Sequence, residues 1–289
     1  MPQREDRAEQ TAGAVVAARI AELTARLAAL APAVRAEEPD SVHQMRITCR
    51  RLRSTLRVFG RLLPDQGGGG PDAVAAELAW LGGALGRARD CEVLGARLLT
   101  LARGLSAADG REDLVADLTE WEREQLLLAR PEVLAALDGP RFPALSAALA
   151  GLCAGPVPPG RARGPAGPEL ARAVRREYRR TARRVRAAER ATGPAAEVAL
   201  HDVRKAAKRA RYTGEAAGPG AARFTARMKA VQDVLGRHQD AVIACHTLRG
   251  LSDGGFGYGV LYGQQLAAAA RAREEFPDVW RQVRKPPRP

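Results

Sequence analysis

Two stripes of different chemistry run side by side along residues 41–64. Steps of three and four residues connect an apolar stripe, which consists of Val42, Met45, Cys49, Leu52, Leu56 and Phe59. The same steps, one residue later, connect a basic stripe of His43, Arg46, Arg50, Arg53 and Arg57. Neighbouring residues on an α-helix differ by about 100°, so the two stripes fit one helix as adjacent faces. The pattern predicts a helix that packs one face on a core and presents a basic row roughly 21 Å long.

A later segment repeats this arrangement. Its apolar stripe is thinner and consists of Leu200, Val203, Ala207, Ala210 and Gly214. Its basic stripe also begins with a histidine and consists of His201, Arg204, Lys208 and Arg211, followed by the aromatic Tyr212. A second pair of motifs follows the rows in the same order, LGRARD ending at Asp90 and LGRHQD ending at Asp240. Two motifs that recur in one order predict an internal duplication.

Breaks in the periodic pattern divide the chain into two helical units. In the first unit they predict helices over 11–32, 41–64, 72–103, 113–128, 131–137 and 143–152, with Pro131 separating two of them. In the second unit they predict helices over 169–191, 195–217, 222–251 and about 260–275. We therefore expect helical bundles at 11–153 and 169–275, a Gly/Pro linker at 154–168 and a flexible basic tail at 276–289.

Composition supports an all-α fold and adds a strong charge. Ala, Leu, Arg and Glu dominate, and aromatic residues make up 4% of the chain, which favours helices over strands. The 289 residues include 46 basic and 33 acidic side chains, for a formal net charge of +13. Residues 160–219 alone hold 16 basic and 6 acidic side chains. A field of this size attracts polyanions such as DNA, RNA, an anionic membrane or a polymer of phosphates.

The sequence indicates neither a secretory signal nor a membrane span. Its first ten residues mix acidic and basic side chains, and no apolar run approaches the roughly 20 residues of a transmembrane helix. The four cysteines contain no Cys-x-x-Cys pair, so we interpret Cys49, Cys91, Cys153 and Cys245 as reduced and structural. We expect a soluble cytoplasmic protein.

The basic rows predict an anion-binding site. Guanidinium groups offer paired donors that match phosphate oxygens, and a helix holds them in a fixed line. The alternative is a solvated basic face, but like charges four residues apart repel, so rows without interleaved acids favour compensation by an anion. Two such rows facing each other would form a basic channel or cleft. We expect its wall to be completed by Arg19, Arg26, Arg172, Arg175, Arg179, Arg183, Lys229 and Arg237.

Histidines and acids occupy matched places in the repeats. We expect His43 and His201 to contact the ligand and to gain charge near phosphate, at about pH 6 to 7. Asp90 and Asp240 are interpreted as groups that orient nearby arginines or cap a packed turn. Glu215 stands where the first row has Arg57, and we expect it to act as an internal counter-ion.

Several other kinds of site are disfavoured. The chain has no phosphate-binding Gly-rich loop with Lys-Ser/Thr, no nucleophile elbow and no paired His/carboxylate zinc signature. No histidine has a second metal ligand at repeated helical spacing, so we expect no metal and no cofactor. Few aromatic residues accompany the basic ones, which argues against a single-strand nucleic-acid site. Duplex binding through charge alone remains open.

The two motif pairs resemble the CHAD family, the conserved histidine α-helical domain. The similar segments are VHQMRITCRRLRSTLRVF with LGRARDCEVL, and LHDVRKAAKRARYTGE with LGRHQDAV, and the resemblance extends over about residues 11–273. It implies two four-helix bundles related by a pseudo-two-fold axis, with a basic surface or central pore. It also implies binding of inorganic polyphosphate and, in some relatives, localisation to polyphosphate granules. The family's histidine and basic positions correspond to His43, Arg46, Arg50, Arg53, His201, Arg204, Lys208 and Arg211.

Our hypothesis is therefore non-catalytic binding of inorganic polyphosphate. One alternative is a phosphohydrolase or phosphotransferase that uses His43 or His201. Another is a nucleic-acid binder of low specificity. Relatives are often fused to a triphosphate-tunnel metalloenzyme domain with a Glu-x-Glu-x-Lys motif, which this sequence lacks, so that domain's hydrolase activity is not transferred.

Overall fold

The protein is all-α in the residues that its computed structural model describes, 10–64, 70–251 and 255–283. These residues form nine α-helices, short 3-10 turns and no strand. The first five helices are α2 (Ala12–Arg35), α3 (Ser41–Phe59), α4 (Gly70–Arg103), α5 (Arg111–Asp138) and α6 (Arg141–Ala154). The other four are α7 (Ala166–Ala188), α8 (Gly193–Ala217), α9 (Ala222–Leu251) and α10 (Phe256–Val283). The prediction of an all-α fold is confirmed. Residues 12–154 form five α-helices, where the sequence pattern predicted six and the family resemblance implied four.

Helices α2 to α6 share one apolar core. The predicted apolar stripe of α3 is buried, with Met45, Cys49, Leu52, Leu56 and Phe59 each at most 2% exposed. The facing stripe of α2 and the long helix α4 pack against it in the same cluster. Because this burial fixes the rotation of α3, the adjacent basic stripe must lie beside the core, at its edge.

Helices α7 to α10 build a second core around the thin stripe of α8. Ala207 and Ala210 are fully buried, and larger side chains of α9, including Phe224, Met228 and Val231, fill the space opposite them. The absence of a side chain at Gly214 leaves room for α9, since a Cβ there would lie 2.3 Å from Thr225 Oγ1. Small residues on one helix and large residues on the other thus give a close helix pair.

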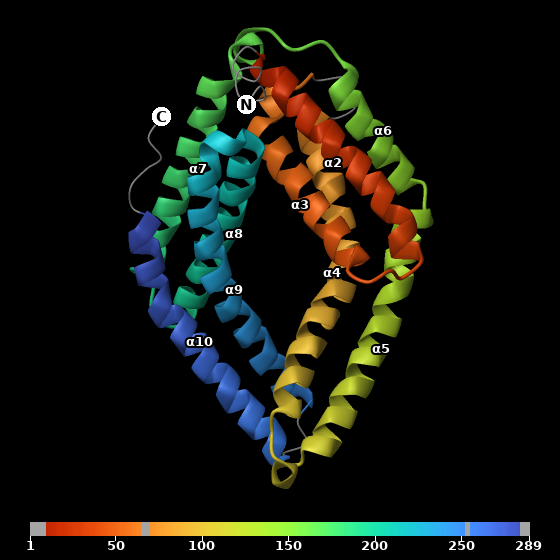
Figure 1. Ribbon diagram of the computed structural model, residues 1–289, viewed down its shortest axis with the longest axis vertical. Helices are drawn as coiled ribbons and strands as arrows, with labels where there is room; N and C mark the ends of the chain where they lie inside the picture. The colour runs from red at the N-terminus through yellow and green to blue at the C-terminus, as the bar shows by residue number, and fades with distance from the viewer. Residues whose placement is uncertain (1–9, 65–69, 252–254, 284–289) are drawn as a thin grey trace.

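The two groups of helices meet at both ends of the molecule (Figure 1). At the end drawn lowermost, α4 and α5 share a third apolar cluster with α9 and α10, which includes Leu98, Leu118, Leu248 and Leu261. At the other end, α3 contacts α8 and α2 contacts α7. Leu170 and Ala173 of α7 belong to the core of the first group. Contacts at both ends of the molecule therefore fix the position of α3 relative to α8.

Two expected helix ends are wrong. Pro131 lies inside α5, which continues to Asp138. The carbonyl that loses its helical partner there belongs to Leu127, whose side chain and that of Leu128 are 58% and 65% exposed, so water can replace the missing donor. The last helix also continues past the expected end near 275, because Phe276, Trp280 and Val283 are buried in the second core. The part of the expected flexible tail up to Val283 is therefore packed helix, and residues 284–289 lie outside the described residues.

The Gly/Pro segment between the units is packed on the start of α2. Ala12 N–H donates to the carbonyl of Gly164 at 2.9 Å, and Ala166 N–H donates to that of Gln10 at 3.1 Å. Ala162 is 1% exposed. A Cβ at Gly13 would lie 2.7 Å from a Val157 methyl group and 2.9 Å from the carbonyl oxygen of Leu62. Gly13 thus permits three segments to meet, and the connection is part of the folded structure.

We predict that Gly13→Ala lowers the free energy of unfolding by about 1 to 3 kcal/mol, because the added methyl group meets backbone that cannot move freely. The matched control is Gly83→Ala in α4, where a Cβ meets nothing within 4 Å. That change should raise stability by up to about 1 kcal/mol through helix propensity. Urea unfolding of both variants measures the difference, and a Gly13→Ala protein as stable as the parent would contradict the packing described here.

Candidate anion-binding site

The basic rows of α3 and α8 face each other across two adjacent pockets. One, the arginine pocket, has a volume of about 450 Å³ and is lined from α3 by Arg50, Arg53 and Arg57. The other, the histidine pocket, has a volume of about 330 Å³ and includes both His43 and His201. Arg50 of α3 and Lys208 of α8 line both pockets, so these two side chains stand at the boundary between them.

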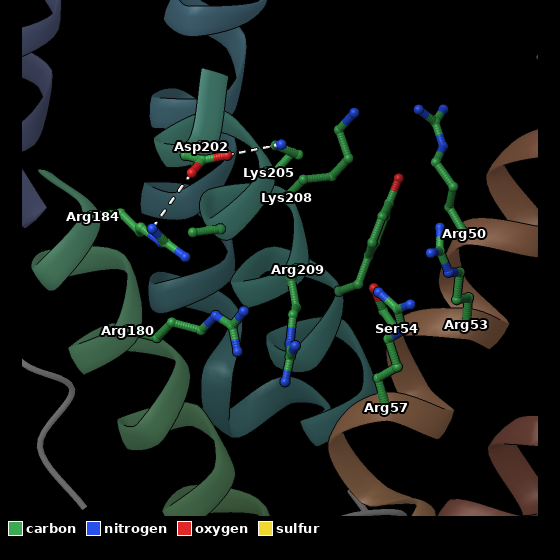
Figure 2. Close-up of a pocket in the computed structure, with 12 residues that line it drawn as sticks. Arg50, Arg53, Ser54, Arg57, Arg180, Arg184, Asp202, Lys205, Lys208 and Arg209 are labelled. Atoms are coloured by element: carbon green, nitrogen blue, oxygen red, sulfur yellow. Dashed lines mark ion pairs between the residues drawn. The ribbon is translucent and has the colours of Figure 1, made fainter. Parts of the chain in front are cut away.

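The arginine pocket is almost entirely cationic. Figure 2 shows Arg50, Arg53 and Arg57 along α3 on one side, Arg180 and Arg184 of α7 on the other, and Lys208 and Arg209 of α8 between them. The one carboxylate in its lining, Asp202, pairs with Lys205 at 2.8 Å and with Arg184 at 3.4 Å. The hydrogen bond from Lys205 lowers the pKa of Asp202, so this group is ionised and still leaves a large positive excess.

The histidine pocket has a mixed lining. Basic side chains on α3, α4 and α8 surround it together with Asp90, Asp240 and the apolar Val93, Leu94 and Ile243. His201 Nδ1 lies 2.9 Å from Gln239 Oε1, which fixes the imidazole ring. Burial lowers the pKa of His43, with Arg89 as the next cause, so this ring is neutral at pH 7 in the free protein. Burial also raises the pKa of Asp240.

A third pocket of about 660 Å³ continues the series at the end of α3. It shares Arg57 and Arg209 with the arginine pocket and adds Arg61 and Arg176. Shared lining residues thus connect the three pockets in order from His43 to Arg61, along the whole basic face of α3. The arrangement suits a ligand that is long and carries negative charge along its length.

Cations at the centre of the series lack anionic partners. Within the described part of the chain, no hydrogen bond or ion pair is made by Arg50, Arg53, Arg57, Arg204 or Lys208. The Nε atoms of Arg50, Arg53 and Arg204 are buried donors without an acceptor. Burial lowers the pKa of Arg50 and Arg53. Unsatisfied buried donors are rare in folded proteins, and a cluster of them indicates a ligand that supplies the acceptors.

Lys208 is the most perturbed of these groups. Burial, followed by the nearby Arg204, Arg50 and Arg46, lowers its pKa to about 7. The ammonium form is therefore only partly populated at neutral pH in the free protein. An anion placed between Lys208 and Arg50 would reverse both causes, because it supplies the missing counter-charge and the missing acceptors.

Carboxylates hold the flanks of the rows in place. Arg46 Nη1 lies 2.6 Å from Asp90, which confirms the expectation that this aspartate orients an arginine. Glu215 accepts hydrogen bonds from Arg51 Nε at 2.8 Å and Arg211 Nε at 2.9 Å, and so serves as the predicted internal counter-ion. Since Arg51 belongs to α3 and Glu215 to α8, this triad also ties the two rows together.

A second carboxylate, Glu177 of α7, is 1% exposed. It accepts a hydrogen bond from Arg209 Nη2 at 3.0 Å, which anchors α7 to α8 behind the arginine pocket.

Half of the predicted site residues line these pockets. They are His43, Arg46, Arg50, Arg53, Arg57, His201, Arg204, Lys208 and Tyr212. The others line none of the three: Arg19, Arg26, Arg172, Arg175, Arg179, Arg183, Arg211, Lys229 and Arg237. Several of these have partners of their own, as with Lys229 and Asp233 at 2.5 Å or Arg26 and Gln44 at 2.8 Å.

The sequence reasoning missed part of the lining. From α7 the pockets use Arg176, Arg180 and Arg184, which recur every four residues and lie beside the buried stripe of that helix. One feature of the sequence could have indicated the inward face of α7, namely the glutamate Glu177 among eight arginines. In the structure this glutamate is buried. From other helices the pockets add Arg61, Arg89, Arg97, Lys205 and Arg209.

The described residues contain no group of three or more His, Cys, Asp or Glu side chains arranged to hold a metal ion. None of the helices in residues 10–64, 70–251 and 255–283 combines the length and apolar character that crossing a bilayer requires. The buried His238 lies outside the pockets, 3.3 Å from Glu197. The site consists of cationic side chains around spaces that an anion can occupy.

Known proteins share the fold and part of the sequence. Two uncharacterised proteins of Mycobacterium tuberculosis, MT2285 and Rv2226, are each 35% identical over 273 residues. The matches cover 88% of this chain and 50% of those proteins, so the chain spans about half the length of these relatives.

Two solved structures have the same architecture. PptA from Streptomyces chartreusis superposes with a TM-score of 0.75 at 22% identity, covering 94% of this chain and all of that one. The crystal structure of the CHAD domain from the plant Ricinus communis has a TM-score of 0.74 at 24% identity, covering 97% and 95%. Residues 18–249 match the CHAD domain family, and the chain therefore belongs to that family.

Proposed function

We propose that this protein binds inorganic polyphosphate without catalysing its breakdown, in the series of pockets between α3 and α8. The observation that carries the proposal is the cluster of unpartnered cations formed by Arg50, Arg53, Arg57, Arg204 and Lys208, all partly buried except the exposed Arg57. The positive charges of this cluster repel one another in the free protein. Phosphate oxygens would offset this repulsion, and they accept paired hydrogen bonds from guanidinium groups.

A repeated linear ligand also accounts for the repeated sequence. The two basic stripes lie on α3 and α8, and both contribute to the same pockets. His43 and His201 line the histidine pocket together, and Arg50 and Lys208 line both pockets. We interpret the two halves as a duplicated unit whose copies face one another around a basic central cleft. A polymer of identical phosphates presents the same groups to both copies, which a ligand with two different ends does not.

The pockets favour a thin polyanion over duplex nucleic acid. A duplex carries its phosphates on the outside of a wide cylinder, whereas these cations line spaces of about 330 and 450 Å³. Stacking of single-stranded bases needs accessible aromatic faces, and Tyr212, the aromatic residue of the second row, is 5% exposed. The location that fits this function is the cytoplasm, on polyphosphate granules.

We predict that Arg50→Met with Lys208→Met weakens binding of polyphosphate at least tenfold and, without ligand, raises the free energy of unfolding by about 0.5 to 2 kcal/mol. Both effects have one cause, because the two cations contact the ligand and repel each other in its absence. Arg103→Met with Arg271→Met removes two exposed charges elsewhere and serves as the control. Calorimetric titration and urea unfolding measure the two effects. Equal losses of affinity in both variants would mean that charge alone is recognised.

Competition tests the ligand class. With labelled long-chain polyphosphate bound at about 0.15 M salt, unlabelled polyphosphate should displace it much more efficiently, per phosphate, than duplex DNA does. The partly buried position of Arg50, Arg204 and Lys208 shields them from salt and from ligands too wide to enter. If DNA competes equally per phosphate, binding is generic and the pockets are not the site.

We also predict that affinity for polyphosphate rises as the pH falls from about 8.5 to 7 and then levels off. Lys208 has its pKa lowered to about 7, so above that value a proton must be taken up when an anion binds, and at most tenfold in affinity is lost per pH unit. His43, whose pKa is below its ordinary value, adds its charge only at lower pH. Lys208→Arg keeps the charge at all these pH values and should flatten the profile. An unchanged profile in that variant would remove Lys208 as the cause.

A further inference from the structure

Helix α7 carries two adjacent basic faces. It contains eight arginines and two glutamates. Three arginines at intervals of four, Arg176, Arg180 and Arg184, line the pockets described above. The other five lie on the neighbouring, outward side of the helix and line none of them: Arg172, Arg175, Arg179, Arg183 and Arg186. These five are called the outer ridge.

The position of the outer ridge follows from the buried stripe of the same helix. Leu170, Val174, Glu177, Thr181 and Val185 are buried, and at about 100° per residue they lie within one narrow sector. The ridge arginines recur at steps of three and four and fall in the sector opposite to it. They form a line of roughly 21 Å along the helix, and four of the five are exposed while Arg175 is half-buried.

The charge of the ridge is almost uncompensated. Arg172 pairs with Glu169 at the start of the helix. The described residues provide no ion-pair partner to Arg175, Arg179, Arg183 or Arg186. Glu177, the only other acid of α7, is buried on the far side and bound to Arg209.

Several exposed basic residues on other helices have a carboxylate partner. Arg123 of α5 pairs with Glu120, Lys229 of α9 with Asp233, and Arg281 of α10 with Asp278. A row of like charges at i and i+3 or i+4 costs helix stability when nothing offsets it. The arginines of the outer ridge therefore repel one another on the surface of the protein, as the cations of the pockets do between the helices.

We infer that the outer ridge is a second binding surface for the same polymer, on which a long polyphosphate chain continues after it leaves the pockets. The inference rests on the proposed function. Arg176 connects the two surfaces. It lines the third pocket, its side chain is 55% exposed, and it lies within one helical turn of Arg172 and Arg179. A flexible chain that emerges past Arg176 therefore meets the ridge next.

The two surfaces should respond differently to ligand length. A short chain is contained by the pockets and gains nothing from the ridge. A long chain binds both, so the second contact is intramolecular and adds avidity without any new recognition chemistry. Because the ridge is exposed, its share of the binding is also the more strongly screened by salt.

The test uses a ridge variant, Arg175→Gln with Arg179→Gln, Arg183→Gln and Arg186→Gln, and polyphosphates of about 10 and about 100 units. We expect affinity for the long chain to fall at least tenfold and its salt dependence to become shallower, with a change of less than about twofold for the short chain. Glutamine keeps helix propensity close to that of arginine, and circular dichroism during heating verifies the fold.

A matched control removes four exposed arginines on other helices, through Arg103→Gln, Arg123→Gln, Arg223→Gln and Arg271→Gln. The same reduction in net charge should leave the ratio of long-chain to short-chain affinity unchanged. Equal losses for both chain lengths in the ridge variant, or no loss for the long chain, would overturn the inference. So would a ridge variant that loses binding to duplex DNA or to an acidic protein while it keeps its affinity for the long chain.

The two proposals fail in different ways. If the pocket variant Arg50→Met with Lys208→Met retains short-chain affinity, the proposed pocket function is wrong whatever the ridge does. If short chains bind through the pockets and the ridge variant behaves like the parent with long chains, only the ridge inference is lost.

Discussion

The structure depends on holding cations together against their mutual repulsion. Arg50, Arg204 and Lys208 come from two helices and converge in partly buried space, where a low effective dielectric strengthens repulsion. Three apolar clusters oppose it: one in each group of helices and a third, around Leu98 and Leu248, that joins the groups at one end. Stability supplied by these cores maintains a strained arrangement at the site, as is common where function requires it.

Acidic residues are distributed so as to support this arrangement without neutralising it. Asp90, Glu177 and Glu215 each engage an arginine at the edge of the basic face, and all three connect one helix to another. The cations between them keep their charge available. An even distribution of the same carboxylates along α3 and α8 would have given two ordinary solvent-facing helices with little attraction for a polyanion.

Periodicity was sufficient to predict α3 and α8, because burial of one stripe dictates where its neighbour lies. It also located nine of the pocket residues on those two helices, although it missed Lys205 and Arg209 of α8. The part contributed by α7 depends on how that helix is rotated about its axis. Contacts with α2 and α8, which no local sequence pattern contains, decide which of its arginine rows faces the pockets. The continuation of α5 through Pro131 was equally non-local, since it requires that the freed carbonyl face water.

Attachment of the two helix groups at both ends has a kinetic consequence. The third cluster closes one end, and the Glu215 triad with the packed segment around Ala162 closes the other. The two groups of helices cannot move apart without breaking the contacts at one of these ends. The site is therefore preorganised, and little conformational entropy is lost when a ligand binds. A polymer lying inside it leaves by sliding along its own axis or by releasing its contacts one at a time. Residence time should then grow with the length enclosed.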